Sequence, residues 1–202
     1  EMYDKVVTFD RKDALRYNLQ FLPLFYHERS KPYNSLRRYN LCFIGTAHSD
    51  RLAILEPLIT QVTGDNYIFL YVQHKVIFYF KWLTSRDYRR QIKSSFNFSP
   101  LSYNQVLGKM EDSVVVVDVH HPLQSGLTMR TFEALALGCK LITTNEDIVN
   151  YDFYDERFIQ VIKREGEIRI RENFFSPLDL NPSQLLSEKY HIRCWLKSLR
   201  EN

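Results

Sequence analysis

The stretch from Ser125 to Glu133 combines residue types that could bind an anion. Ser125 and Thr128 carry hydroxyls, Gly126 lets a ligand approach the backbone, and Arg130 adds a full positive charge. If a helix begins near Gly126, its first backbone N–H groups are unpaired and carry the positive end of the helix dipole. Glu133 follows Arg130 by three residues, on the same side of the helix and about one turn deeper. The arrangement predicts a phosphate at the helix start and a ribose whose hydroxyls reach Glu133.

The same residues also have an interpretation without a ligand. Ser125 or Thr128 would then cap the helix, and Arg130 would pair with Glu133 on a solvated face. Caps and ion pairs of this spacing occur on most helices, so the spacing alone leaves both interpretations open.

The flanking residues predict the elements that position this stretch. Val114–Val119 is short, β-branched and nearly all apolar, which is typical of a parallel strand buried on both faces in the middle of a sheet. His120–Ser125 is expected to be a loop. From about Gly126 or Leu127, apolar residues recur at helical spacing as far as Gly138, which we expect to end the helix, and Leu141–Thr144 predicts a second strand. A right-handed βαβ unit places the loop and the helix start at the carboxyl edge of the sheet, where α/β proteins bind ligands.

The segment from Ser125 to Thr144 resembles the donor-binding segment of the GT-B glycosyltransferases. In that class a Glu-Gly loop opens a helix, a second glutamate eight residues later begins Glu-Ala-x-Ala-x-Gly, and a strand follows. Gly126 matches the glycine and Glu133 the second glutamate, whereas Ser125 stands where the class has its first glutamate. More narrowly, His121–Thr131 and Lys140–Asn145 are similar to bacterial glycosyltransferases of capsular polysaccharide and lipopolysaccharide biosynthesis.

This resemblance implies a fold and a function. The fold would be α/β, a Rossmann-like and mainly parallel sheet with helices on both faces, as in the C-terminal half of a GT-B enzyme. Residues 1–37 would be the end of the N-terminal acceptor domain and the interdomain linker, and residues 38–202 the C-terminal nucleotide-sugar-binding domain. The function would be transfer of a sugar from a nucleoside diphosphate sugar to a bacterial surface polysaccharide, either an oligosaccharide or a lipid-linked acceptor held by the N-terminal domain.

The resemblance also implies which residues bind the donor. Gly45 and Thr46 follow the strand Leu41–Ile44 in the first βα turn, which lacks the G-x-G-x-x-G pattern of dinucleotide sites. The base would be held by backbone groups of Ser99 and Leu101, and the ribose by Glu133. The residues expected at the diphosphate are Gly45, Thr46, Lys75, Ser125, Gly126, Leu127, Thr128 and Arg130. Arg51 either faces the phosphates or lies exposed on its helix.

The sequence does not identify the catalytic residues. His120 and His121 are weak candidates for an internal base, because histidine titrates near neutral pH. The alternative is that they steady the loop or touch the donor sugar. No metal-ligand spacing is present, and adjacent histidines in a strand point to opposite faces, so no metal is expected. No cofactor is expected either, apart from the donor substrate itself.

Two other functions remain open. One is a sugar-nucleotide epimerase of the same architecture, which would need further acid and base carboxylates near the sugar. The other is a regulatory module that binds a nucleotide without turnover. We expect this chain to be a fragment that binds the donor but does not transfer sugar alone, because residues 1–37 are too few for an acceptor domain of about 50 residues or more.

Composition limits the partners and the compartment. Twenty-seven basic and 24 acidic residues give a formal charge of +3, which is too balanced to indicate nucleic-acid binding. Three widely spaced cysteines in apolar surroundings, Cys42, Cys139 and Cys194, predict buried thiols in a reducing cytoplasm. No signal peptide or apolar run of membrane-spanning length is present. We therefore expect a cytoplasmic protein, with contact at the inner face of the membrane as an open alternative.

That alternative rests on the aromatic and basic segment from Lys75 to Lys93. It could be an interfacial membrane element. It could equally be a helix packed on the sheet, whose solvent-exposed side would carry Lys81, Arg86, Arg89, Arg90 and Lys93.

The rest of the chain predicts further elements. We expect a strand at Lys5–Asp10, a brief helix after Arg11 and an extended segment at Phe21–Tyr26. Further expected elements are a helix over 52–62 capped by Ser49 or Asp50, a strand over 67–73, a helix over 102–110 and a strand over 158–162. The last helix would begin at Asn181-Pro182 and carry an apolar stripe of Leu185, Leu186, Ile192, Leu196 and Leu199.

Overall fold

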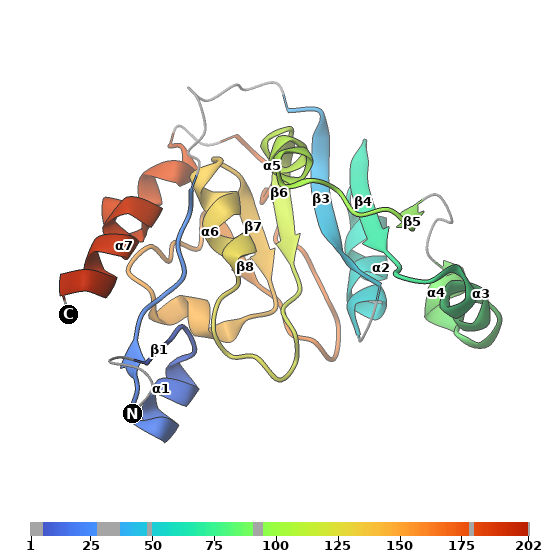
Figure 1. Cartoon of the computed structure of the whole chain (residues 1–202). Helices are drawn as coiled ribbons and strands as arrows, with labels where there is room; N and C mark the ends of the chain where they lie inside the picture. The colour runs from blue at the N-terminus through green and yellow to red at the C-terminus, as the bar shows by residue number, and fades with distance from the viewer. Residues whose placement is uncertain (1–5, 28–36, 48–49, 91–94, 178–179, 202) are drawn as a thin grey trace.

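Six parallel strands form the central sheet of the protein (Figure 1). The structure is a computed structural model that describes residues 6–27, 37–47, 50–90, 95–177 and 180–201. The strands are β3 (Tyr39–Thr46), β4 (Asn66–Tyr71), β5 (Phe96–Asn97), β6 (Ser113–Asp118), β7 (Lys140–Thr143) and β8 (Ile159–Val161). Their order across the sheet is β5-β4-β3-β6-β7-β8, and every neighbouring pair is parallel.

This order is that of a Rossmann fold, and the expected fold class is confirmed. The chain builds the sheet outward from β3 in one direction and then returns to build it outward from β6 in the other. The strand order therefore reverses between β3 and β6, and the carboxyl ends of these two strands border the crevice where such sheets bind ligands.

Apolar side chains cover both faces of the sheet, because successive residues of a strand point to opposite sides. On one face, Leu41 and Phe43 pack with α2 (Arg51–Gln61), α3 (Lys75–Thr84) and α4 (Arg86–Arg90). On the other face, Cys42 and Val116 pack with α5 (Tyr103–Glu111) and α6 (Met129–Ala136), around the fully buried Phe132. The run of valines in β6 is thus explained by burial on both sides.

The βαβ unit predicted around residue 126 is present, with a later helix start. The helix α6 begins at Met129, not at Gly126 or Leu127, and Leu127 instead packs in the core with 1% of its surface exposed. The chain leaves α6 through Gly138, whose φ of 72° is in the left-handed region that favours glycine. A Cβ there would also lie 2.6 Å from the side-chain oxygen of Asn181.

The predicted solvent-facing basic side is present only in part. Arg86 and Arg89 are exposed but belong to α4, and Lys81 in α3 is half-exposed. The exposed residues of α3 include four large apolar or aromatic side chains. Phe78 is buried and anchors the helix. The side chain of Arg90 and all of Lys93 lie outside the described residues.

The end of the chain is less regular than predicted. Asn181 does cap a turn, since its side chain accepts from the backbone N–H of Ser183, but this 3-10 turn ends at Leu185. Extended backbone at Leu186 and Ser187 then leads through a second 3-10 turn, Glu188–Tyr190, to α7 (Ile192–Glu201). The prediction of one continuous helix was therefore wrong, and Cys194 in α7 is exposed, not buried.

The N-terminal residues pack against the same body. They form β1 (Val7–Thr8), α1 (Arg11–Tyr17) and β2 (Gln20–Phe21), with β1 and β2 paired in parallel. Tyr26 is fully buried; its N–H donates to Tyr190 and its carbonyl accepts from Ile192. The assignment of residues 1–37 to another domain and a linker stays a prediction, and most of the proposed linker lies outside the described residues.

The remaining predicted features are mostly confirmed. The strands and helices expected from residue 39 to 162 are present, and a further 3-10 turn spans Glu146–Asn150. Asp50 occupies the N-cap position of α2, yet its carboxylate forms an ion pair with Arg164 instead of capping, and Ser49 lies outside the described residues. Among the described residues, none of the helices has the length and apolar character needed to cross a bilayer.

Candidate functional site

A cavity of about 570 Å³ opens where the strand order reverses, at the carboxyl ends of β3 and β6. Its lining comes from both strands, from the start of α2, from the loop before α5 and the start of α5 itself, and from the first two turns of α6. Of the residues predicted from the sequence, this cavity brings together Gly45, Leu101, Thr128, Arg130 and Glu133. The lining also includes Arg51, Tyr103 and Asp118.

Glu133 is a buried carboxylate on the wall of this cavity. Only 7% of its surface is exposed. Burial raises the pKa of Glu133, and this effect is opposed by the charge of Arg130 and by a hydrogen bond with Tyr103. Both Arg130 and Glu133 are described, and no ion pair joins them; the Arg130 Nη1 instead lies 3.0 Å from the Met110 Sδ. The interpretation as an ion pair on a solvated helix face therefore does not describe this structure.

Asp118 is a second buried carboxylate of the site, and it was not among the residues predicted from the sequence. It ends β6 and accepts hydrogen bonds from the hydroxyls of Thr128, at 2.6 Å, and Thr131, at 2.9 Å. The carboxylate thereby ties the first turn of α6 to the end of the central strand. The available signal was a charged residue immediately after four valines, since a buried strand rarely carries a charge without a partner or a ligand.

Arg51 faces the cavity and completes its cationic side. Its guanidinium donates to the Val119 carbonyl at 3.1 Å and to the Thr46 hydroxyl at 2.6 Å. Burial lowers the pKa of Arg51, and the nearby carboxylates of Asp118 and Asp50 oppose this shift. Thr46 itself bonds Arg51 and does not line the cavity.

Outside the cavity lining lie five further residues of the predicted donor site: Lys75, Ser99, Ser125, Gly126 and Leu127. Lys75 is exposed, and its Nζ lies 5.7 Å from the centre of the Phe98 ring. Ser99 is exposed in the loop before α5, and Leu127 is part of the core beneath the start of α6. Their assignment to the diphosphate or the base stays a prediction.

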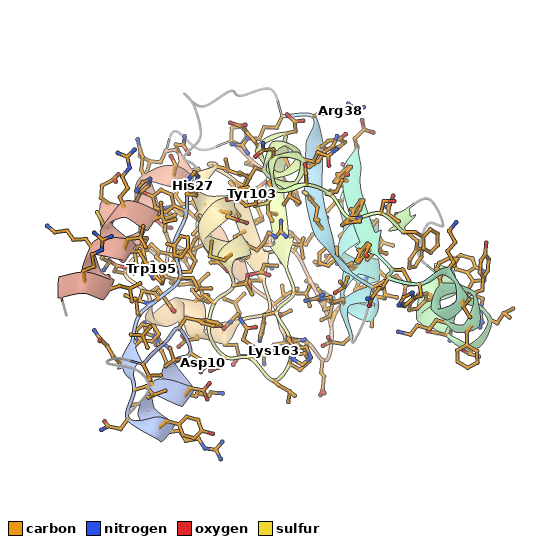
Figure 2. All side chains as sticks on the ribbon, in the orientation of Figure 1. Asp10, His27, Arg38, Tyr103, Lys163 and Trp195 are labelled. Carbon is orange, nitrogen blue, oxygen red and sulfur yellow. The ribbon has the colours of Figure 1, made fainter. Side chains whose placement is uncertain are left out.

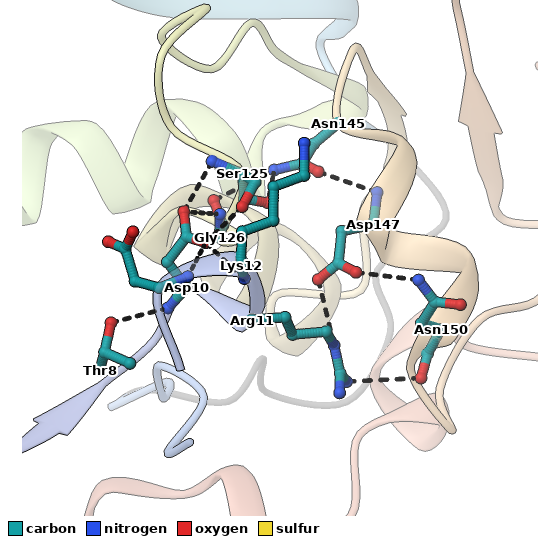
Figure 3. Close-up of polar contacts among 10 residues, drawn as sticks. Thr8, Asp10, Arg11, Lys12, Ser125, Gly126, Asn145, Asp147 and Asn150 are labelled. Atoms are coloured by element: carbon teal, nitrogen blue, oxygen red, sulfur yellow. Dashed lines mark hydrogen bonds and ion pairs between the residues drawn. The ribbon is translucent and has the colours of Figure 1, made fainter. Parts of the chain in front are cut away.

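Ser125 and Gly126 already bond a carboxylate from the same chain (Figure 3). The Oδ2 of Asp10 accepts from the backbone N–H groups of Ser125 and Gly126, both at 2.8 Å, and its Oδ1 accepts from the Ser125 hydroxyl. In this structure the turn bonds the carboxylate of Asp10, and its assignment to the diphosphate stays a prediction. The glycine is needed for this contact, because a Cβ at Gly126 would lie 2.6 Å from the carbonyl oxygen of Phe9.

Asp10 is held ionised by these contacts. Burial by itself would raise the pKa of Asp10, but the hydrogen bonds from the Ser125 side chain and from the Gly126 and Ser125 amides outweigh it and lower the pKa to about 2. Asp10 also caps α1, accepting from the amides of Lys12 and Asp13. One carboxylate thus joins the start of α1 to the turn before α6.

A second cavity, of about 810 Å³, lies on the other side of that turn. Asp10 and Lys163, both labelled in Figure 2, belong to its lining, together with Ser125 and His120. The lining carries charges of both signs and comes from α1, from the loop after β6 and from the segments that follow β7 and β8. Such a surface suits a neutral polar ligand better than a highly charged one.

The two histidines occupy different environments. His120 is buried, with its Nδ1 2.8 Å from the Thr144 hydroxyl, and burial and the charge of Arg164 lower its pKa to about 4. It is therefore neutral at pH 7. His121 is exposed, and its Nδ1 accepts from the backbone N–H of Leu123 at 3.2 Å. His120 lines the second cavity and His121 does not.

The structure also bears on metal binding. Within the described ranges, no cluster of three or more histidine, cysteine, aspartate or glutamate side chains is arranged to hold a metal ion.

Comparison with known proteins shows the fold. Sixteen chains of solved structures match this one, among them a chain of the crystal structure of the GtfA/B complex. That match has a TM-score of 0.50 and 10% identity, and covers 91% of this chain. This chain spans only 40% of the matched chain's length. No protein-family model and no curated protein matches.

Proposed function

We propose that this chain binds a nucleoside diphosphate sugar in the cavity between β3 and β6, as the donor-binding part of a glycosyltransferase. One observation carries the proposal above all: the buried Glu133 lies beside Arg130 on the wall of a cavity at the reversal point of a parallel sheet. A buried carboxylate is costly unless it is paired, hydrogen-bonded or bound to a ligand. Among the described residues, Glu133 forms no close ion pair, and it faces a cavity. A ribose offers two neighbouring hydroxyl donors to such a group.

The other wall residues suit the remaining parts of the donor. The start of α6 supplies a helix dipole, and Arg130 and Arg51 supply charge for the diphosphate. Leu101 lies in the loop before α5, where backbone groups can bond the edge of a base. Asp118 positions other residues of the site, because its hydrogen bonds with Thr128 and Thr131 fix the first turn of α6.

In this proposal, catalysis rests on stabilisation of the leaving group. As the bond between the sugar and the diphosphate breaks, negative charge grows on the diphosphate oxygens. Cations and dipoles that are already in place stabilise that charge without reorganisation. Removal of one such preorganised donor typically costs about 100- to 1000-fold in rate.

The acceptor and the setting are inferred from the sequence resemblance alone. We propose a bacterial surface polysaccharide as the acceptor, as in capsular polysaccharide or lipopolysaccharide biosynthesis, and a cytoplasmic site of action. The acceptor would be held by an N-terminal domain, with this chain as the C-terminal half of a GT-B enzyme.

Incubation of the purified chain with radiolabelled UDP-, GDP- and CDP-sugars tests the function. We expect retention of one donor class on the protein, without transfer or interconversion. Formation of an epimerised sugar nucleotide would favour the epimerase. Retention of free nucleotide with no preference for its sugar conjugate would favour a regulatory module. Failure to retain any of these nucleotides would contradict the proposal outright.

Transfer of sugar by this chain alone would contradict the proposal that a separate N-terminal domain holds the acceptor. If product forms with an oligosaccharide acceptor at a rate unaffected by an added N-terminal domain, the acceptor site lies within these residues. The acceptor would then bind in the second cavity, and His120 would be the candidate catalytic base.

A further inference from the structure

The helix α3 exposes an apolar stripe. Val76, Tyr79, Phe80 and Leu83 are 80%, 57%, 68% and 76% exposed. They follow one another at positions i, i+3, i+4 and i+7, so they form one continuous face of the helix. An amphipathic helix of a compact domain normally turns such a face toward the core. Here the face points to solvent, and exposed apolar patches of this kind mark interaction sites.

The opposite side of α3 fixes this orientation. Phe78 is 2% exposed and packs among the rings of Phe96, Phe98, Tyr88 and Trp82, with centroid distances between 4.9 and 6.4 Å. The Tyr88 hydroxyl in turn bonds the Ala47 carbonyl beyond the end of β3. This aromatic cluster anchors α3 and α4 to the edge of the sheet. Rotation of the helix to bury the stripe would break it.

Basic side chains surround the stripe. From Lys75 to Lys93 the sequence contains six lysines and arginines and one acidic residue, Asp87. Lys75 lies at the start of α3, and the Arg89 guanidinium donates to the Trp82 and Leu83 carbonyls at its end. The Lys81 Nζ lies 5.4 Å from the centre of the Tyr88 ring, on the side of the helix that faces α4. Cations therefore lie at both ends of the stripe and along its flank.

We propose that the exposed face of α3 binds the surface of a membrane that contains anionic lipids. The four stripe residues would enter the boundary between headgroups and acyl chains, and the basic residues would pair with lipid phosphates. Aromatic side chains such as Tyr79 and Phe80 favour this boundary region. Figure 1 shows α3 and α4 standing out from the β5 edge of the sheet, where a flat surface can reach them.

The charges argue against a second copy of the chain as the occupant. A symmetric pairing of two α3 helices through this face would bring the surrounding lysines and arginines of one copy against those of the other. Like charges facing each other in an interface are unfavourable, whereas an anionic bilayer complements them. This surface is independent of the proposed donor site, because the two share no residue except Lys75, whose assignment to the donor site is untested.

Flotation with lipid vesicles tests this inference. The purified chain is mixed with vesicles of phosphatidylcholine alone, or of phosphatidylcholine with phosphatidylglycerol. We expect binding to the anionic vesicles, weaker binding to the neutral ones, and release by added salt, because salt screens the headgroup attraction. The double variant Phe80→Ser, Leu83→Ser should lower the partition coefficient about tenfold or more, because it removes two of the four inserted side chains.

A matched variant controls for loss of exposed apolar surface in general. Leu15 in α1 and Leu196 in α7 are 85% and 47% exposed, on elements far from α3 (Figure 1). The double variant Leu15→Ser, Leu196→Ser should bind vesicles like the wild type. Equal thermal unfolding of all three proteins verifies that the substitutions leave the fold intact.

Three results would overturn the inference. The first is failure of the wild type to bind anionic vesicles. The second is equal binding by the wild type and the Phe80→Ser, Leu83→Ser variant. The third is a dimer in sedimentation velocity that the same variant abolishes, which would assign the stripe to a second copy of the chain.

Discussion

The carboxylate of Asp10 accepts hydrogen bonds from two segments that are far apart in the chain. Its two carboxylate oxygens accept from Ser125, Gly126, Lys12 and Asp13, and thereby join α1 to the turn before α6. Hydrogen bonds to a charged group each contribute roughly 1.5 to 3 kcal/mol, and the lost bonds are partly replaced by water. We expect Asp10→Ala to lower the free energy of unfolding by roughly 1 to 3 kcal/mol in urea denaturation.

The neighbouring carboxylate of Asp13 provides the control for this prediction. Asp13 is exposed on the same helix, so Asp13→Ala should change stability by a few tenths of a kcal/mol, about the value of a charge near a helix start. The contribution of Asp10 to the free energy of unfolding should be fully present above about pH 4. It should fade as the pH falls toward the pKa of about 2 in the folded protein, because folding lowers the pKa of Asp10. Equal stability of the two variants at neutral pH would refute the role of Asp10.

His120 predicts a pH dependence of stability at mildly acidic pH. Its pKa falls from an ordinary 6.5 to about 4 in the folded protein, first because of burial. As the pH is lowered below 6.5, the unfolded chain takes up a proton on this residue and the folded chain does not. The free energy of unfolding should therefore decrease by roughly 1 to 3 kcal/mol between these two pH values.

Substitution of each histidine isolates that contribution. His120→Gln should flatten the dependence of stability on pH between 4 and 6.5, whereas His121→Gln, at an exposed position, should leave it unchanged. Denaturation curves recorded across this range provide the comparison. Parallel pH profiles of the His120 variant and the wild type would show that His120 does not titrate as described.

Single residues also show where sequence reasoning reaches its limit. Ser125 and Gly126 can be recognised as an anion-binding turn from their types and their place before a helix. Their partner, Asp10, lies more than a hundred residues away, and no local pattern pairs them. Asp118 escapes prediction for a different reason, since the run of valines indicates burial and hides the significance of the charge at its end.

At the scale of elements, the end of α6 depends on one side chain from outside the helix. The Arg37 guanidinium donates to the carbonyls of Leu137 and Gly138 at 3.0 and 2.9 Å, and to the Ser113 carbonyl at 2.6 Å. It thus satisfies carbonyls that a helix end leaves unpaired and links α6 to the start of β6. We expect Arg37→Met to lower the free energy of unfolding by roughly 2 to 4 kcal/mol, because three carbonyls lose a charged donor.

Arg38 is the matched comparison. It is exposed, with its guanidinium 5.1 Å from the centre of the Tyr39 ring, a contact typically contributing about 0.5 to 1 kcal/mol. Arg38→Met should therefore be much milder than Arg37→Met in thermal or urea unfolding. If Arg37→Met were no more destabilising than Arg38→Met, water would be replacing the hydrogen bonds of the Arg37 guanidinium.

Elements with strong periodicity could be predicted, and elements set by tertiary packing could not. The strand β6, the helix α6 and the stop at Gly138 follow from β-branched runs, helical spacing and the freedom of glycine. A helix packed on the sheet was one of the two interpretations of the segment that forms α3, but the sequence did not show which face would point outward, because that depends on the ring cluster around Phe78. The break after Leu185 depends likewise on packing, since Leu186 and Tyr190 both reach the core across an extended segment.

At the scale of the whole molecule, the N-terminal segment behaves structurally as part of the same body. Tyr26 is fully buried in the same hydrophobic cluster as Phe132, and its backbone bonds both sides of the turn into α7. Removal of a buried aromatic side chain typically costs about 3 to 5 kcal/mol. We expect Tyr26→Ala to destabilise the whole domain by that amount in a single cooperative urea transition.

Tyr17 distinguishes this docking from a loosely attached linker. It is 57% exposed in α1, so Tyr17→Ala should change stability by about 0.5 kcal/mol or less. If Tyr26→Ala were as mild as Tyr17→Ala, residues 6–27 would be an appendage, as expected for a linker that belongs to another domain.

The fold class could be predicted from the sequence, and the ligand could not. Alternation of strands and helices predicts parallel βαβ units, and their handedness places the loops after β3 and β6 at one edge. What binds there depends on side chains from several segments, among them Arg51 and Tyr103, which meet only in the folded chain. The distant structural match supports the fold and leaves the ligand to experiment.

Calorimetric titration of nucleoside diphosphates into the wild type and Glu133→Ala tests the central claim most directly. We predict that the wild type binds one of UDP, GDP or CDP, that its 2′-deoxy form binds more weakly, and that Glu133→Ala loses about 10- to 100-fold in affinity. The variant should no longer distinguish the ribose from the deoxyribose form. Glu172→Ala, at an exposed carboxylate outside both cavities, should bind like the wild type. Unchanged affinity of Glu133→Ala, or no binding of any nucleotide by the wild type, would contradict the proposed donor site.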